Sequence, residues 1–221
     1  TVAANAAPAI EWQVALGGSD SDTAAGIVPA SDGGYIMVGT TYSADGDVTG
    51  QQGNGDVWVV KLSDAGAIQW TKTLGGSAHE TGSSIQQTAD GGYIVAGTTH
   101  STDGDVASGS HGISDGWVVK LSSTGDIEWE NALGGTTFDN LSSVQQTADG
   151  GYIATGYSSS NDGDATGSHG LGDAWVVKLN ADGSLVWQKQ LGGSDSDISY
   201  SIQQTFDGGG AADGYILIGS T

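Results

Sequence analysis

The sequence repeats itself about every 58 residues, and this repeat restricts the folds open to the chain more than any other feature. Its clearest marker is the tripeptide Leu-Gly-Gly, which begins at Leu16, Leu74, Leu133 and Leu191. A second marker, Asp-Gly-Gly-Tyr-Ile, returns with the same spacing. A fixed period of this size is typical of solenoids and propellers, in which neighbouring copies share one continuous body.

All seven tryptophans keep the phase of the repeat. They form two columns, one of Trp12, Trp70, Trp129 and Trp187 and one of Trp58, Trp117 and Trp175. Both columns lie in apolar segments, so we expect the indoles to pack between repeats. The alternative is that they form platforms on which sugars stack, a role that also suits an amphipathic ring.

Each repeat contains four segments with the character of β-strands. In the second repeat these are residues 84–88, 93–99, 116–121 and 127–133. The first two are joined by Asp90-Gly91-Gly92, a hairpin turn in which glycine supplies the positive φ. Residues 116–121 are rich in β-branched and aromatic side chains, which favour strands. No segment has a convincing helical period, so the sequence predicts an all-β chain.

Four antiparallel strands in each repeat are the pattern of a propeller blade. We therefore predict a β-propeller-like fold of about four blades, each of four antiparallel strands, with the last blade incomplete. A parallel β-helix is the competing architecture, but its coils are much shorter than this repeat.

The repeats predict a single propeller-like domain over residues 1–221. The predicted units are residues 17–74, 75–133 and 134–191, with a partial unit over 192–221. Residues 10–16 match the fourth strand of a repeat, and we expect them to belong to the closing blade. The sequence of the last unit predicts only two strands, so its open edge could accept a strand from another molecule. A longer propeller, of which this chain is a part, would explain the same pattern.

Composition excludes several classes of function. The chain has 26 Asp+Glu against 5 Lys+Arg and a net charge of −21, which disfavours nucleic acid and anionic membranes as partners. It has no cysteine for disulfides or thiol chemistry, and no apolar run long enough to span a membrane. The opening Thr1–Pro8 is small and uncharged, as expected of a mature chain after signal cleavage, so we expect an extracellular or cell-surface location.

An acidic loop between the second and third strands of each repeat is the strongest candidate for chemistry. It contains Asp-Gly-Asp and closes on a further aspartate before the third strand. The candidate metal ligands are Asp45, Asp47 and Asp56, then Asp103, Asp105 and Asp115, then Asp162, Asp164 and Asp173. Several carboxylates close together suit Ca²⁺, which takes six to eight oxygen ligands. The alternative is that Asp-Gly-Asp forms only a solvated turn.

Other polar positions also recur once per repeat. An acidic residue follows each Leu-Gly-Gly, at Asp22, Glu80, Asp139 and Asp197. The third strands carry Lys61, Lys120 and Lys178, which we expect to pair with carboxylates for structural reasons. His111 and His169 occupy a position that is Gln52 in the first repeat, so we expect loop hydrogen bonds there rather than zinc ligands.

The sequence offers no asymmetric cluster for catalysis. Paired carboxylates can hydrolyse glycosides, but these recur in every repeat, and no Gly-x-Ser-x-Gly nucleophile motif is present. We therefore predict no catalytic residues, no enzymatic activity and no bound cofactor apart from the calcium considered above.

The full repeat reads Asp-Gly-Gly-Tyr-Ile-x-x-Gly, an acidic loop, Asp-x-Trp-Val-Val-Lys-Leu, then Gly-x-Ile-x-Trp-x-x-x-Leu-Gly-Gly. Over residues 10–221 this pattern resembles the repeats of large secreted bacterial and archaeal surface proteins of the β-propeller type. The resemblance implies a propeller-like fold, export, and a role in cell-surface structure or attachment, and it transfers no catalytic residues. The fourth repeat departs from the pattern through an insertion at residues 208–213 and the lack of a third strand.

Together these features predict an extracellular, non-enzymatic structural subunit that is stabilised by calcium. We expect it to form homo-oligomers or polymers, or to dock on a partner, by accepting a strand into its incomplete blade. The alternative is a carbohydrate- or ligand-binding module of an adhesin or secreted enzyme, with a surface glycan as its partner.

Overall fold

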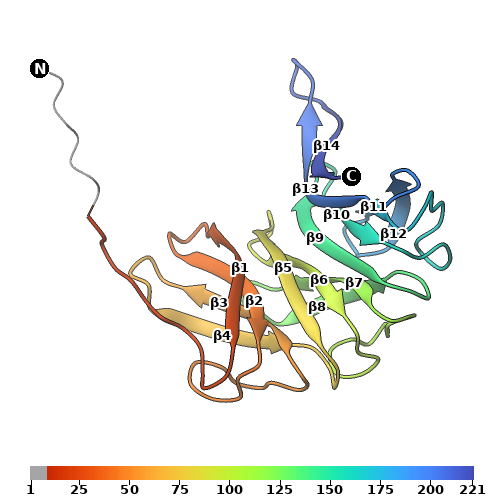
Figure 1. Ribbon diagram of the computed structural model, residues 1–221. Coiled ribbons are helices and arrows are strands. Elements are labelled where there is room, and N and C mark those ends of the chain that lie inside the picture. Colours follow the sequence, from red (N-terminus) through yellow and green to blue (C-terminus); the bar gives the residue numbers. More distant parts are fainter. Residues whose placement is uncertain (1–8) are drawn as a thin grey trace, which may run out of the picture.

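The computed structural model describes residues 9–221, and within them the ordered elements are all β-strands (Figure 1). The strands are β1 (Asp22–Pro29), β2 (Tyr35–Thr41), β3 (Asp56–Leu62), β4 (Ile68–Leu74), β5 (Glu80–Gln87), β6 (Tyr93–Thr99), β7 (Asp115–Leu121), β8 (Ile127–Leu133), β9 (Asp139–Gln146), β10 (Tyr152–Ser158), β11 (Asp173–Leu179), β12 (Leu185–Leu191), β13 (Ile198–Phe206) and β14 (Ala212–Ser220). This part of the chain has no helix long and apolar enough to cross a membrane. The opening Thr1–Pro8, on which the expectation of a mature N-terminus rests, lies outside the described residues.

The strands form blades in the predicted order. Three sheets are four-stranded antiparallel meanders, β1-β2-β3-β4, β5-β6-β7-β8 and β9-β10-β11-β12. The fourth sheet contains only β13 and β14. The prediction of an all-β, propeller-like fold with an incomplete last blade is confirmed.

The blades follow one another along an arc, with the first and last sheets at its two ends (Figure 1). The first strands of consecutive sheets are neighbours. β1 packs beside β5, β5 beside β9, and β9 beside β13. In residues 9–221 no strand of the first sheet is hydrogen-bonded to β13 or β14, so strand pairing does not close the arc into a ring.

The core lies between consecutive blades. Val38 and Val59 of the first blade pack in one cluster with Val95 and Trp117 of the second. The next cluster joins the second blade to the third in the same way. Trp58, Trp117 and Trp175 are all buried. Trp117 and Trp175 therefore pack between consecutive blades, as predicted, whereas Trp58 packs among residues of the first blade and Leu16.

The outer tryptophan column also joins the blades. Trp70 meets Tyr93 of the next blade edge to face, with ring centroids 5.9 Å apart. Trp129 and Tyr152 repeat this contact at 5.6 Å. Such aromatic pairs contribute about 1 kcal/mol each beyond the area they bury.

Residues 10–16 differ from the prediction, since they form no strand. Trp12 still meets Tyr35 edge to face at 5.8 Å, where the fourth strand of a preceding blade would place its tryptophan. A strand needs a hydrogen-bonding neighbour, and the two-stranded sheet expected to supply it lies at the other end of the arc (Figure 1). The predicted place of residues 10–16 in a closing blade is not observed.

Candidate functional site

Each Asp-Gly-Asp loop is fastened to the Leu-Gly-Gly connection that enters its own blade. In the second blade, Asp103 Oδ1 accepts the N–H of Ser77 at 2.7 Å, and Asp105 Oδ2 accepts the N–H of Gly75 at 3.1 Å. Gly104 lies between them with φ of +67°, where a Cβ would be 2.5 Å from the carbonyl oxygen of Gly75. Glycine is required here by both the backbone conformation and the close contact.

The same fastening recurs in the neighbouring blades. In the first, Asp45 and Asp47 accept the N–H groups of Ser19 and Gly17, at 2.7 and 3.2 Å. In the third, Asp162 accepts the backbone N–H of Thr136 at 2.8 Å, and the N–H of Asp164 donates to the Gly134 carbonyl. The carboxylates of Asp45, Asp47, Asp103, Asp105 and Asp162 thus hold a backbone turn.

The closing aspartates lie elsewhere. Asp56, Asp115 and Asp173 are the first residues of β3, β7 and β11, and all three are fully buried. One carboxylate oxygen, Oδ2, accepts the N–H of the residue four positions earlier, at 2.6, 2.8 and 2.7 Å in the three blades. The other oxygen, Oδ1, is buried without a hydrogen-bond partner in each case.

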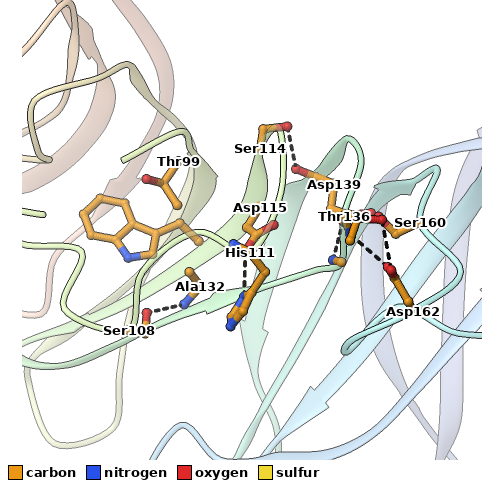
Figure 2. A network of polar contacts seen from close by, with 12 residues as sticks. Thr99, Ser108, His111, Ser114, Asp115, Ala132, Thr136, Asp139, Ser160 and Asp162 are labelled. Atoms are coloured by element: carbon orange, nitrogen blue, oxygen red, sulfur yellow. Dashed lines mark hydrogen bonds and ion pairs between the residues drawn. The ribbon is translucent and has the colours of Figure 1, made fainter. Parts of the chain in front are cut away.

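Each closing aspartate faces the acidic residue that follows the next Leu-Gly-Gly. Asp115 Oδ1 and Asp139 Oδ2 lie 2.5 and 2.6 Å from the position that a Cβ on Gly134 would occupy. Figure 2 shows Asp115 and Asp139 near each other, with the hydrogen bonds from His111 and Ser160 that orient them. The two carboxylates therefore flank one glycine, and they come from two different blades.

We call these carboxylates the junction pairs. They are Asp56–Glu80 at Gly75, Asp115–Asp139 at Gly134, and Asp173–Asp197 at Gly192. At Gly75 the oxygens of Asp56 and Glu80 lie 2.7 and 2.5 Å from the corresponding Cβ position, and at Gly192 those of Asp173 and Asp197 lie 2.2 and 2.3 Å from it.

The predicted grouping of ligands therefore needs correction. Asp45 and Asp47 contact the connection that enters the first blade, whereas Asp56 contacts the connection that leaves it. Over residues 9–221 no three His, Cys, Asp or Glu side chains are placed together to hold a metal ion. Glu80 was predicted to belong to a repeating acidic column, but the contact between this column and the closing aspartates was not predicted. Both sets of residues recur with the same period, and this common period could have indicated the contact.

Burial raises the pKa of two carboxyl groups in the junction pairs. It raises the pKa of Asp56 to about 6, and the charges of Glu80 and Asp105 act in the same direction. Burial also raises the pKa of Asp115, to which the charge of Asp139 contributes. A buried carboxylate beside a second one is expected to resist ionisation unless a cation is present.

The buried lysines neutralise other carboxylates. Lys61, Lys120 and Lys178 form ion pairs with Asp32, Asp90 and Asp149, which belong to the hairpin turns between the first two strands of each blade. The expectation of one structural lysine–carboxylate pair per blade is confirmed.

The histidines bond within the loops or to each other's backbone. His111 Nδ1 lies 2.9 Å from Asp115 Oδ2, which also accepts the His111 backbone N–H, so the predicted loop hydrogen bond is confirmed. The His100 ring lies 5.8 Å from that of His79 and contacts its carbonyl oxygen.

The two ends of the arc expose apolar surface. At the first blade, Trp12, Val14, Ile27 and Met37 line a groove of about 370 Å³. At the last sheet, Phe206, Ile216 and Ile218 are more than half exposed, and no strand from the described part of the chain pairs with the far side of β14.

Comparisons with known proteins identify no family, since no family model matches the chain. The chain is 24% identical over 198 residues to the "Regulatory protein FlaEY" of Caulobacter vibrioides. The match covers 82% of this chain and 21% of that protein, so the chain spans about a fifth of the length of this relative.

Two solved structures are similar in shape. One is a protein of unknown function from Bacteroides caccae, with TM-score 0.48 and 11% identity over 87% of this chain and 52% of that one. The other is a protein provisionally named a gluconolactonase, with TM-score 0.42 and 13% identity over 88% of this chain and 59% of that one. At these scores neither likeness carries an argument about activity.

Proposed function

We propose that the chain is a non-enzymatic structural module of an exported cell-surface assembly, which joins further copies of itself by accepting a strand at its last sheet. The observation that carries the proposal is the free edge of β14. In each complete blade, the second strand is paired on both sides, as β6 is by β5 and β7. Within residues 9–221, β14 is paired with β13 alone. An unpaired edge presents free N–H and C=O groups to an incoming strand.

The outer face of β14 is apolar like the faces that join blades. Ile216 and Ile218 occupy the positions of Ile36 and Val38, which are completely buried against the second blade. On β14 the same positions are 62% and 67% exposed. This face therefore matches a surface that the molecule elsewhere covers with another blade.

A carboxylate on the last sheet is placed to pair with the lysine of an incoming third strand. Thr205 donates a hydrogen bond to Asp213 at 2.6 Å, as Thr147 does to Asp149 in the third blade. Asp149 is paired with Lys178 of the third strand β11. An incoming strand of the pattern Asp-x-Trp-Val-Val-Lys-Leu would bring a lysine to Asp213.

A second copy of the chain is the occupant that we propose. Each copy contains the third-strand pattern three times, in β3, β7 and β11, and donation of one of these strands requires it to leave its own blade. At the opposite end of the arc, beside the first blade, each copy also exposes Trp12, Val14 and Ile27. The last sheet of one copy can therefore contact the first blade of the next, and these two surfaces differ in shape. Such head-to-tail contacts between unlike surfaces build open polymers unless their rotation closes a ring.

The proposal includes export and stabilisation by calcium. A net charge of −21 with 5 basic residues supports a chain that attracts cations. A ligand that binds only the folded state stabilises it by about 2.7 kcal/mol at a hundredfold excess over its Kd. EGTA is therefore expected to lower the Tm, and added calcium to restore it.

The test measures the solution mass of the chain with and without a peptide that copies residues 172–180. We expect species larger than the 22.1 kDa monomer, and we expect the peptide to bind and disperse them. A matched peptide with glutamate in place of its lysine should act more weakly, because it places a second negative charge beside Asp213. A monomer that ignores both peptides would contradict the proposal and favour a ligand-binding module.

A further inference from the structure

We propose that each junction pair binds a calcium ion between two consecutive blades. The proposed ligands include Glu80, Asp139 and Asp197, which lie outside the Asp-Gly-Asp loops, together with Asp56, Asp115 and Asp173. The inference rests on the calcium part of the proposed function and gives it a location. It is independent of the assembly through β14.

Unpartnered carboxylate oxygens carry the inference. Asp56 Oδ1, Asp115 Oδ1, Asp139 Oδ1 and Asp173 Oδ1 are all buried and have no hydrogen-bond donor among the described residues. Asp173 Oδ1 has one longer contact, with His169 Nδ1 at 3.4 Å. A buried acceptor without a partner costs about 1–3 kcal/mol, and more when it is charged. The occurrence of this feature at all three junctions argues against an accident of packing at one of them.

Hydrogen bonds to the backbone hold the carboxylates of the junction pairs. The Asp115 Oδ2 atom accepts the His111 N–H, and this contact leaves Oδ1 directed at Gly134. From the other blade, Asp139 Oδ2 accepts the N–H of Gly135 at 2.7 Å and a hydrogen bond from Ser160. Glu80 accepts the N–H of Gly76 at 2.8 Å in the corresponding way. The paired carboxylates are thus held in place by the folded backbone.

The charge of the pairs is not balanced by protein. Three of the lysines reach the hairpin-turn aspartates instead, and Lys72 pairs with Asp126. The basic side chains near the junctions are histidines. The rings of His111 and His169 are about half exposed and lie beside Asp115 and Asp173, and burial lowers the pKa of His79, which lies near Glu80. A divalent cation would balance the two carboxylates of each pair.

The donor atoms favour calcium among biological cations. The pairs offer carboxylate oxygens, and the sequence has no cysteine for zinc or other thiophilic metals. Two carboxylates flank the glycine at each junction, and at the first junction Asp105 also accepts the N–H of Gly75. Main-chain carbonyls and water must supply the remaining ligands, which calcium accepts readily. Magnesium demands stricter octahedral geometry and loses water reluctantly.

The glycines of Leu-Gly-Gly fit this role. A side chain on Gly75, Gly134 or Gly192 would project between the two carboxylates of its pair. Glycine therefore leaves the approach to the pair free. Because each pair takes one residue from each of two blades, a bound ion would hold consecutive blades together.

The test uses Tb³⁺, which replaces calcium at oxygen sites and emits when excited through a nearby tryptophan. Trp117 lies two residues from Asp115 and is buried in the same blade. We expect the whole chain to show emission sensitised by tryptophan that Ca²⁺ suppresses. In the double variant Asp115→Asn/Asp139→Asn, one class of sites should bind Tb³⁺ more weakly by at least about tenfold.

Asp162→Asn is the matched control, because Asp162 is acidic, lies at the same junction and uses its carboxylate to hold Thr136. We expect it to retain all Tb³⁺ sites. If the double variant fails to fold by near-UV circular dichroism, Asp173→Asn/Asp197→Asn at the third junction serves instead, with the loss of one site expected.

The outcomes separate this inference from the broader proposal. Unchanged Tb³⁺ binding by a folded junction variant would overturn the junction sites while leaving calcium stabilisation intact. A loss confined to Asp162→Asn would move the ion to the Asp-Gly-Asp loops and overturn the inference as well. If the unmodified chain binds neither Tb³⁺ nor Ca²⁺, both the sites and calcium stabilisation fail, whereas assembly through β14 is judged by solution mass alone.

Discussion

The second and third junctions contain the same types of residue, two aspartates and a glycine, but their surroundings differ. Asp115 faces Asp139 across Gly134 between the second and third blades, and Asp173 faces Asp197 across Gly192 before the last sheet. At the second junction both glycines of Leu-Gly-Gly are buried, whereas at the third both are exposed.

The difference comes from the blade that follows. At the second junction the Asp-Gly-Asp loop of the third blade covers the connection, and a Cβ on Gly135 would lie 2.2 Å from Asp162 Oδ1. At the third junction no atom of the described residues lies within 4 Å of the corresponding position on Gly193. The connection leaving a blade is therefore protected by the loop of the next blade, and the two-stranded last sheet has no such loop among the described residues.

The largest effect is expected from a methyl group at these two glycines. Gly135→Ala places a Cβ against the side chain and carbonyl of Asp162, so it should lower the free energy of unfolding by about 2–3 kcal/mol. Gly193→Ala meets open space and should change it by less than about 0.5 kcal/mol. Urea unfolding of the two variants measures the contrast. Equal losses would show that the loop does not protect the connection.

A smaller contrast is expected at the opposite end of the same two blades. Lys178 has Asp149 as its one carboxylate partner among the described residues, whereas Lys120 has both Asp90 and Glu128. Asp149→Asn leaves a buried ammonium group without a counter-charge and should cost about 2 kcal/mol.

Asp90→Asn is the matched control, since Glu128 remains 2.9 Å from Lys120. We expect this variant to lose about 1 kcal/mol or less, as partly exposed pairs do. Thermal or urea unfolding distinguishes the two variants, and a larger loss for Asp90→Asn would reverse the assignment of the weaker pair.

The smallest effect concerns acid. The hydroxyl of Thr147 and the ammonium of Lys178 lower the pKa of Asp149 from 3.8 to about 2. A lowered folded-state pKa contributes stability that is present above about pH 4 and is lost as the pH falls toward 2. Urea midpoints between pH 5 and pH 2.5 should fall less steeply in Asp149→Asn than in the parent chain. Parallel curves would contradict this assignment.

Local pattern was enough to predict the elements of the fold. The segment at residues 116–121 was expected as a strand from its β-branched and aromatic residues, and it lies within β7. The turn at Gly91 has φ of +86°, as the hairpin pattern required. These features depend on a few neighbouring residues, so a single sequence contains them.

The candidate site was only half predictable. Asp56 and Asp105 were both predicted to be metal ligands, and each was grouped with its own loop. The structure brings Asp56 to Glu80 of the following blade instead. Spacing along a loop could not reveal this, because the path of the loop is set by the connection on which it packs.

The period, the four strands of each blade and the turns between them follow from local sequence, because strand alternation and turn glycines act over short distances. The contacts across blades depend on tertiary packing, and so does the formation of a strand from a segment with strand-like sequence. Residues 10–16 have the sequence pattern of a fourth strand but do not form a strand, because a strand exists only where another strand completes its hydrogen bonds. The junction pairs likewise arise only when two blades stack, since each blade supplies one carboxylate of the pair.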